Sequence, residues 1–233
     1  MAKHLPARWQ VIPTENYGLA DLHIHSSVSD GIPHIPQILE YVELQTHLNV
    51  VAITDHDKIE GSYQARELVE KDRYRFEVVV GMEVSTREGH LLALFIESPV
   101  PSFQPLASTI AAVHAQRGLC IAPHPMSRQR DSIRRHTIEN LLKRAEEGEG
   151  TYLDGLEIIN PHAAPLFCTE DVRYLTKNDF HLAEIGGSDA HSLSLVGSRY
   201  TIFAGRKAED LYQAILRKTT RAAGSSLDHY PPL

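Results

Sequence analysis

Two histidines separated by one residue stand near the N-terminus, in the stretch ADLHIHSSVSDG. If this stretch is a strand, His23 and His25 point to one face together with Asp21, because strand side chains alternate between faces. The intervening leucine and isoleucine then point into an apolar layer. Two adjacent imidazoles are a poor core element and a good pair of metal ligands. A strand with a solvated histidine face has the same pattern, so the rest of the sequence has to decide between the two.

Histidines and acidic residues recur at the ends of other predicted strands. In a parallel α/β sheet or barrel, ligands and catalytic groups collect at the carboxyl ends of the strands. Six strand ends that carry such residues therefore predict a convergent cluster. The candidate ligands are His23, His25, Asp30, His56, Glu83, His90, His124, Asp189 and His191.

The chemistry of these side chains narrows the choice of metal. They are nitrogen and oxygen donors without a thiolate, which suits Zn²⁺, Mn²⁺ or Fe²⁺. Nine donors are enough for two or three ions if one carboxylate bridges. Three divalent cations would outweigh the charge of Asp30, Glu83 and Asp189, and the excess favours an anionic, phosphate-like substrate. Closely spaced ions can also activate a water and stabilise both the attacking and the leaving oxygen.

The elements that must position these residues follow from apolar periodicity. Predicted strands cover 19–25, 49–55, 76–85, 90–96, 119–125, 155–160, 183–189 and 198–204. Predicted helices cover 35–48, 61–72, 105–118, 136–148, 170–179 and 208–218. Because strands and helices alternate with short connections, we expect parallel strands and an α/β architecture. Periodicity alone allows either a closed barrel or an open sheet.

Composition sets the class of the protein. The 233 residues are 42% hydrophobic and 23% charged, which is ordinary for a globular protein with a sizeable core. We expect a single domain over 1–233, with 1–17 and 224–233 as loosely held tails. Cys120 and Cys168 are too few and too far apart for a disulfide framework, which predicts a reducing cytoplasm.

Charge and hydropathy limit the partners. No apolar run approaches the roughly 20 residues of a membrane span, and the first residues lack the apolar core of a signal peptide. The net charge of -7 argues against an extended basic surface for nucleic acid. Bound metals would still let a short oligonucleotide reach the site. The expected partner is thus a small phosphorylated substrate or a short oligonucleotide, and the oligomeric state is left open.

Seven blocks in this order resemble the polymerase and histidinol phosphatase (PHP) family of metal-dependent phosphoesterases. They are DLHIHSSVSDG, AITDHD, GMEVST, GHLLAL, APHP, GLEIIN and GGSDAH, within residues 19–204. The resemblance implies a distorted (β/α)7 TIM-like barrel with a trinuclear metal site at the carboxyl ends of the strands. It also implies hydrolysis of a phosphate ester by attack of a metal-bound hydroxide on phosphorus.

The resemblance implies a ligand set for each ion. His23, His25, Glu83 and Asp189 would hold the first ion, and Asp30, His56 and His191 the second. Glu83 would bridge to a third ion, which His90 and His124 also bind. The assignment of His90 depends on a segment whose length varies in the family.

The catalytic prediction comprises Asp55, His191, Arg128 and Arg199. Asp55 is either an acid/base group or a partner that fixes His56, and we prefer the second role because ligating histidines need such partners. Asp21 is expected to do the same for His23 or His25. The two arginines would anchor phosphate. At another strand end, His162 is either a substrate contact or an ordinary loop histidine.

Two other functions stay open at this point. An amidohydrolase-like C–N hydrolase also begins with H-x-H on a barrel strand, but the sequence offers no plausible bridging lysine, and Asp30, His56 and Glu83 would have no metal role. The other alternative is a non-catalytic metal-binding module that acts in regulation or binding. Turnover of a phosphoester with full metal loading would distinguish it from an enzyme.

Overall fold

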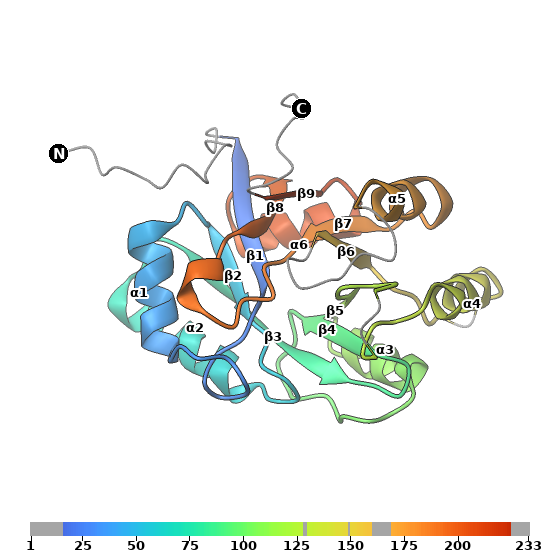
Figure 1. Ribbon diagram of the computed structural model, residues 1–233, viewed down its shortest axis with the longest axis horizontal. Coiled ribbons are helices and arrows are strands. Elements are labelled where there is room, and N and C mark those ends of the chain that lie inside the picture. Colours follow the sequence, from blue (N-terminus) through green and yellow to red (C-terminus); the bar gives the residue numbers. More distant parts are fainter. Residues whose placement is uncertain (1–15, 128–129, 149, 160–168, 225–233) are drawn as a thin grey trace.

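The computed structural model of the chain describes residues 16–127, 130–148, 150–159 and 169–224. Their strands form one sheet in the order β7-β6-β5-β4-β3-β2-β1-β8-β9 (Figure 1). The strands are β1 (Tyr17–Ile24), β2 (Val50–Ile53), β3 (Glu77–Ser85), β4 (His90–Leu94), β5 (Leu119–Ala122), β6 (Gly155–Ile159), β7 (Ala183–Gly186), β8 (Arg199–Ala204) and β9 (Arg221–Gly224). The expected strands are thus present, and β9 is an additional one.

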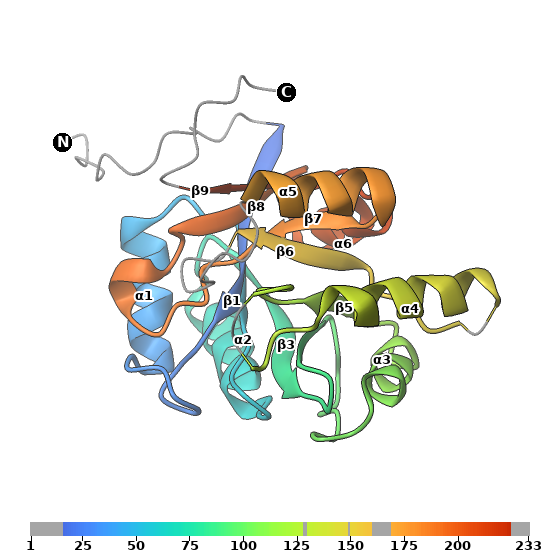
Figure 2. The ribbon, with the colours of Figure 1, turned by 45° about the vertical axis from the view of Figure 1, so that its right-hand side comes forward.

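Helices follow most of the strands. They are α1 (Ile35–Gln45), α2 (Glu60–Asp72), α3 (Leu106–His114), α4 (Arg135–Glu146), α5 (Thr169–Tyr174), which continues as a π-helix (Leu175–Asp179), and α6 (Ala208–Leu216). A short 3₁₀ helix (Leu193–Leu195) precedes β8. The helices lie around the outside of the sheet, with α1 and α2 at the left of the view in Figure 1 and α3 and α4 at the right (Figures 1 and 2). None of the described helices is long and apolar enough to cross a membrane.

The strand directions are mixed, which corrects the expectation of an all-parallel sheet. The pairs β1–β2, β2–β3, β5–β6 and β6–β7 are parallel, whereas β4 runs antiparallel to β3 and β5. β8 runs antiparallel to β1 and β9. The turn over 86–89 explains the first reversal, because a parallel crossover needs a dozen or more residues.

The reversal of β4 matters for the site. The antiparallel register pairs His90 with Ser85, so the first residue of β4 lies beside the last residue of β3. In a parallel β4, His90 would lie at the opposite edge of the sheet. The reversal therefore brings a residue from the start of a strand to the edge where the parallel strands end.

β7, at one end of the sheet, approaches β8, next to the other end, so the sheet is a nearly closed, TIM-like barrel. The Thr201 hydroxyl of β8 accepts a hydrogen bond from the Gly186 N–H and donates one to the Gly186 carbonyl, both at 3.0 Å. A Cβ on Gly186 would lie 2.3 Å from the Tyr200 carbonyl oxygen. Glycine at the end of β7 is thus what allows β8 to come so close.

Apolar side chains fill both layers around the strands. All four residues of β2 are buried, as expected for a strand covered on both faces. Leu39 and Val42 of α1 belong to the same apolar cluster as Val51 and Ile53 of β2. This packing fixes the strands whose carboxyl ends carry the polar side chains described next.

Candidate metal centre

Glu83, near the end of β3, lies among five imidazole rings. Its Oε2 atom is 3.1 Å from Nε2 of His23, 3.2 Å from Nε2 of His25 and 3.3 Å from Nδ1 of His56. The two strand histidines are fully buried, and Glu83 is 1% exposed. His23 on β1 and His25 directly after it thus face the carboxylate on β3.

The other oxygen of Glu83 faces a second pair of histidines. Its Oε1 atom lies 2.9 Å from Nδ1 of His90 and 3.2 Å from Nε2 of His124. His90 begins β4, and His124 follows β5. A carboxylate with nitrogen donors beside both oxygens has the geometry of a group that bridges metal ions.

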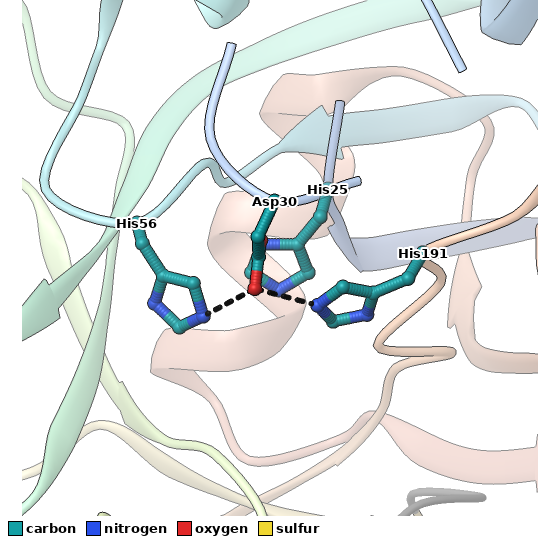
Figure 3. A group of neighbouring side chains, drawn as sticks. All are labelled: His25, Asp30, His56 and His191. Carbon is teal, nitrogen blue, oxygen red and sulfur yellow. Dashed lines mark hydrogen bonds and ion pairs between the residues drawn. The ribbon is translucent and has the colours of Figure 1, made fainter. Parts of the chain in front are cut away.

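Asp30 gathers three histidines at the mouth of the site (Figure 3). Its Oδ2 atom lies 3.2 Å from Nε2 of His191 and 3.6 Å from Nε2 of His56. Its Oδ1 atom lies 3.5 Å from Nδ1 of His25. One donor atom from each of these four residues lies within 4.8 Å of the others. The Asp30 side chain is 52% exposed, so this part of the cluster borders solvent.

Asp189 contacts the same cluster from the loop after β7. Its Oδ1 atom lies 3.4 Å from Nε2 of His23, 3.2 Å from Nε2 of His25 and 3.7 Å from Nδ1 of His191. Asp189 and His124 both have a positive φ, of 49° and 32°. Non-glycine residues in this region are strained and cluster at functional sites. All nine side chains predicted as ligands therefore lie together.

The cluster surrounds a cavity of about 350 Å³. Its lining consists of Asp30, His56, Glu83, His90, His124, Asp131, Asp189 and His191. Asp131 was not among the predicted residues, because it follows no strand end and its loop has to fold back to reach the cavity. Within the described residues, no lysine or arginine belongs to this lining.

Glu157 on β6 is a second residue that the sequence did not reveal. Its Oε1 atom lies 2.9 Å from Nδ1 of His23, and its Oε2 accepts a hydrogen bond from the His124 N–H at 2.7 Å. The carboxylate thereby orients the His23 ring so that Nε2 faces Glu83 and Asp189. Partners of this kind fix the tautomer and direction of ligating histidines.

Asp55 occupies a different position from the one expected. Its Oδ1 accepts hydrogen bonds from the Ser26 N–H at 2.8 Å and the Ser29 hydroxyl at 2.6 Å, and its Oδ2 accepts one from the Ser26 hydroxyl at 2.7 Å. A Cβ on Gly61 would lie 2.2 Å from Oδ2, so this carboxylate needs the glycine beside it. Asp55 thus ties down the loop that leads to Asp30 instead of contacting the His56 ring.

Asp21 also holds backbone instead of an imidazole. Its carboxylate accepts hydrogen bonds from the N–H groups of Ser188 at 3.0 Å, Gly197 at 2.8 Å and His23 at 3.4 Å. Burial raises the pKa of Asp21 to about 6, against the lowering effect of these hydrogen bonds. The expected contact with the His23 or His25 ring is replaced by a clamp on the loops before and after Asp189.

Of the two predicted phosphate anchors, the structure describes only Arg199, and that residue does not line the cavity. Arg199 begins β8, and its guanidinium donates a hydrogen bond to the Ser198 carbonyl at 2.8 Å. Its side chain packs where a Cβ on Gly224 would lie, and it is not part of the cavity lining. Arg128 and His162 lie outside the described residues.

Electrostatic interactions couple the buried carboxylates of the cluster to the buried imidazoles of His23 and His25. Burial alone would raise the pKa of Glu83, but the imidazoles, that of His23 foremost, hold it well below its usual range. Burial would lower the pKa of His25, yet Asp189 and Glu83 raise it to about 9. Burial likewise would lower the pKa of His23, yet Asp189 and Glu83 raise it well above its usual value. The carboxylates thus favour positive charge at the centre of the cluster.

Buried imidazole nitrogens without hydrogen bonds also indicate that the donors fit divalent ions. Both ring nitrogens of His25 and Nδ1 of His124 are buried without a hydrogen bond among the described residues. Buried polar atoms are normally hydrogen-bonded. Imidazole nitrogens that are buried, unsatisfied and close to carboxylates are the arrangement that a metal ion completes.

A separate group of His114, Cys120 and Asp154 lies away from the cavity. The Asp154 carboxylate lies 3.0 Å from Nε2 of His114 and accepts a hydrogen bond from the Cys120 N–H at 2.8 Å. Burial raises the pKa of the Cys120 thiol well above its usual value, as expected for an unreactive residue in an apolar strand. These contacts tie the end of α3 to β5 and the start of β6.

Comparison with known proteins identifies a relative of which this chain covers more than two thirds of the length. An uncharacterized protein of Methanocaldococcus jannaschii is 38% identical over 119 residues, which make up 46% of this chain and 68% of that protein. A family model described as PHP-associated matches residues 176–220. This chain belongs to the PHP family. The family comprises metal-dependent phosphoesterases, which are hydrolases of phosphoester bonds.

Two further comparisons concern a sequence relative and a solved structure with the same fold. The phosphoribosyl 1,2-cyclic phosphate 1,2-diphosphodiesterase of Eggerthella lenta is 38% identical over 104 residues, which are 42% of this chain and 38% of that enzyme. A two-domain Bacteroides vulgatus protein that contains a predicted PHP-like metal-dependent phosphoesterase has the same fold. It matches with a TM-score of 0.73 and 20% identity, over 97% of this chain and 70% of that one.

Proposed function

We propose that this PHP protein hydrolyses a phosphate ester at a centre of three divalent ions, with Zn²⁺, Mn²⁺ or Fe²⁺ as the metal. The observation that carries the proposal is the position of Glu83, whose two oxygens face five imidazole nitrogens at 2.9–3.3 Å. No single ion could use all nine donors, whereas a bridging carboxylate allows several ions to share them.

Three groups of side chains would each hold one ion. The first is His23, His25, Glu83 and Asp189. The second is Asp30, His56 and His191, and the third is Glu83, His90 and His124. Every group combines imidazole and carboxylate donors, which is typical of catalytic sites for Zn²⁺, Mn²⁺ and Fe²⁺.

Such ions, when bound, activate a water and offset the charge that develops on phosphate oxygens. The residues of the chain give the site its direction. His23, His25 and Glu83 form its closed floor, whereas the side chains of His191 and Asp30, 33% and 52% exposed, border its entrance. Substrate would therefore enter past Asp30 and His191 and place its phosphoryl group above Glu83.

The substrate class follows from charge and size. Because no described lysine or arginine lines the cavity, its attraction for a phosphate group would come from the metal centre itself. A cavity of about 350 Å³ suits a small phosphorylated compound or the end of a short oligonucleotide. The Eggerthella relative is named for a phosphodiester, which makes diesters the first choice among substrates.

Turnover assays test this function. The purified chain would be incubated with bis(p-nitrophenyl) phosphate, p-nitrophenyl phosphate and a short 5′-phosphorylated RNA, with Mn²⁺ or Zn²⁺ and with a chelator. We expect metal-dependent phosphoester cleavage that the chelator abolishes. Full metal loading without turnover of any of the three would favour the non-catalytic binding module.

The variant His124→Ala tests the third ion, with His114→Ala as the matched control. Both remove an imidazole, but only His124 lies at the cavity. We expect His124→Ala to lose turnover by about 100-fold or more while it stays folded, as for other removed electrostatic groups. His114→Ala should stay active. Unchanged turnover in His124→Ala would remove the third ion from the chemistry.

A further inference from the structure

We propose that Asp131 is an additional ligand of the ion held between Glu83, His90 and His124. The inference rests on the proposed metal centre and extends its ligand set. It would give the third ion a second carboxylate beside Glu83, in addition to the two imidazoles, and such mixed nitrogen and oxygen donor sets suit Zn²⁺ and Mn²⁺.

The Asp131 carboxylate lies beside the ring nitrogen of His90 that faces Glu83. Its Oδ2 atom is 3.7 Å from Nδ1 of His90, the same atom that lies 2.9 Å from Oε1 of Glu83. Donor atoms of His90, His124 and Asp131 all lie within 4.8 Å of one another. An ion placed among the two imidazoles would therefore have carboxylates on two sides.

The backbone of the loop fixes Asp131 to both histidines. Its carbonyl accepts a hydrogen bond from the His90 N–H at 2.7 Å. The neighbouring Ser132 hydroxyl donates to the His124 carbonyl at 2.9 Å. Gly89 makes the approach possible, because it has a φ of 139° and its Cβ would lie 2.8 Å from the Asp131 oxygen. Two hydrogen bonds thus fix position 131 relative to His90 and His124.

The side chain also has the exposure expected of an outer ligand. Asp131 is 42% exposed, whereas Glu83 and His124 on the inner side are 1% and 4% exposed. Its role would be to close the third site towards solvent. Substitution should leave the fold in place, because the loop is attached through the backbone of Asp131 and not through its carboxylate.

Cobalt titration tests this assignment without reference to activity. The metal-free full-length chain would be titrated with Co²⁺ for the wild type, Asp131→Asn and Asp131→Cys. The matched controls are Glu139→Gln and Glu139→Cys, since Glu139 on α4 has a similar side-chain exposure of 46% and pairs with Arg135. Circular dichroism would verify that each variant is folded.

We expect Asp131→Asn to bind one Co²⁺ about tenfold or more weakly than Glu139→Gln does, with the other ions unaffected. Asp131→Cys should show a thiolate-to-cobalt charge-transfer band that the wild type and Glu139→Cys lack. The inference is overturned if Asp131→Asn binds like Glu139→Gln, or if Asp131→Cys shows no such band. A wild-type chain that binds no Co²⁺ would instead overturn the proposed metal centre itself.

Discussion

Glu83 determines how the other side chains of the centre can work. Its single carboxylate has imidazoles beside both oxygens. One oxygen faces His23 and His25, and the other faces the histidines of β4 and of the loop after β5. Around it lies a layer of residues that orient the proposed ligands. Glu157 is the clearest member of that layer, because it contacts the ring of His23 and the backbone of His124.

The substitution Glu157→Gln should weaken metal binding. The amide can accept from the His23 ring with one end, but its NH₂ group would then face the His124 N–H, and the negative charge beside His23 is lost. We expect metal affinity to fall by about 10- to 100-fold in a chelator competition titration. Glu184→Gln on β7, which removes an ion pair with Arg173, is the control. Equal affinity in both variants would contradict the orienting role.

Metal binding should depend on pH in a direction set by the histidines. The pKa of His25 is raised to about 9 in the ion-free cluster, so this ring is protonated at neutral pH. A ligating imidazole must be neutral, so ions have to displace the proton. Affinity should therefore rise with pH up to about 9. Calorimetry in two buffers of different ionisation enthalpy should show net proton release, and proton uptake or none would contradict the assignment.

At the residue scale, sequence reasoning found the nine side chains that lie together and missed Asp131 and Glu157. H-x-H and the strand-end histidines are visible because metal ligands have distinctive types and spacing. Asp131 and Glu157 are ordinary acidic residues whose roles depend on a loop that folds back and on a neighbouring strand. Asp55 was assigned to the wrong partner, because adjacency to His56 in sequence says nothing about where a strand-end carboxylate points.

Among the elements, the loop over 25–31 is held in position by Asp55. The three hydrogen bonds of this buried carboxylate all go to Ser26 and Ser29, and they set the path of the chain towards Asp30. The reversal of β4 has a comparable effect for His90. Apolar periodicity predicted that β3 and β4 exist, but periodicity carries no information about strand direction. Only the short turn over 86–89 indicates that β4 runs antiparallel to β3.

The variant Asp55→Ala should destabilise the fold as well as the site. Removal of a buried, charged acceptor leaves the donors at Ser26 and Ser29 unsatisfied, and we expect a loss of about 3 kcal/mol in the free energy of unfolding. Ser29→Ala, which removes one donor, should cost about 1 kcal/mol. Urea denaturation measures both. A fully stable Asp55→Ala variant that has lost turnover would instead favour an acid/base role for Asp55.

For the whole molecule, ion binding and stability should be coupled. The donors come from β1, β3, β4 and the loops after β1, β2, β5 and β7, so bound ions would join segments far apart in the sequence. The barrel-like α/β architecture followed from alternating elements and the family resemblance. Its extra strand β9 did not, because RAAG is too short and too weakly patterned to indicate a strand.

Metal removal should therefore lower the melting temperature. A ligand present at 100 times its dissociation constant stabilises the folded state by about 2.7 kcal/mol, which corresponds to about 5–10 °C for a chain of this size. We expect at least this shift between metal-loaded and chelator-treated protein in calorimetry. Glu83→Gln should lose most of it. A shift of the same size in Glu83→Gln would place the stabilising ions elsewhere.

The position of bound ions tests the trinuclear centre most directly. A crystal structure of the metal-loaded chain, with anomalous scattering recorded at each metal edge, would locate every ion. We predict three peaks around Glu83, one beside His23, His25 and Asp189, one beside Asp30, His56 and His191, and one beside His90 and His124. Fully loaded crystals without anomalous density at Glu83, or with ions bound only elsewhere, would contradict it.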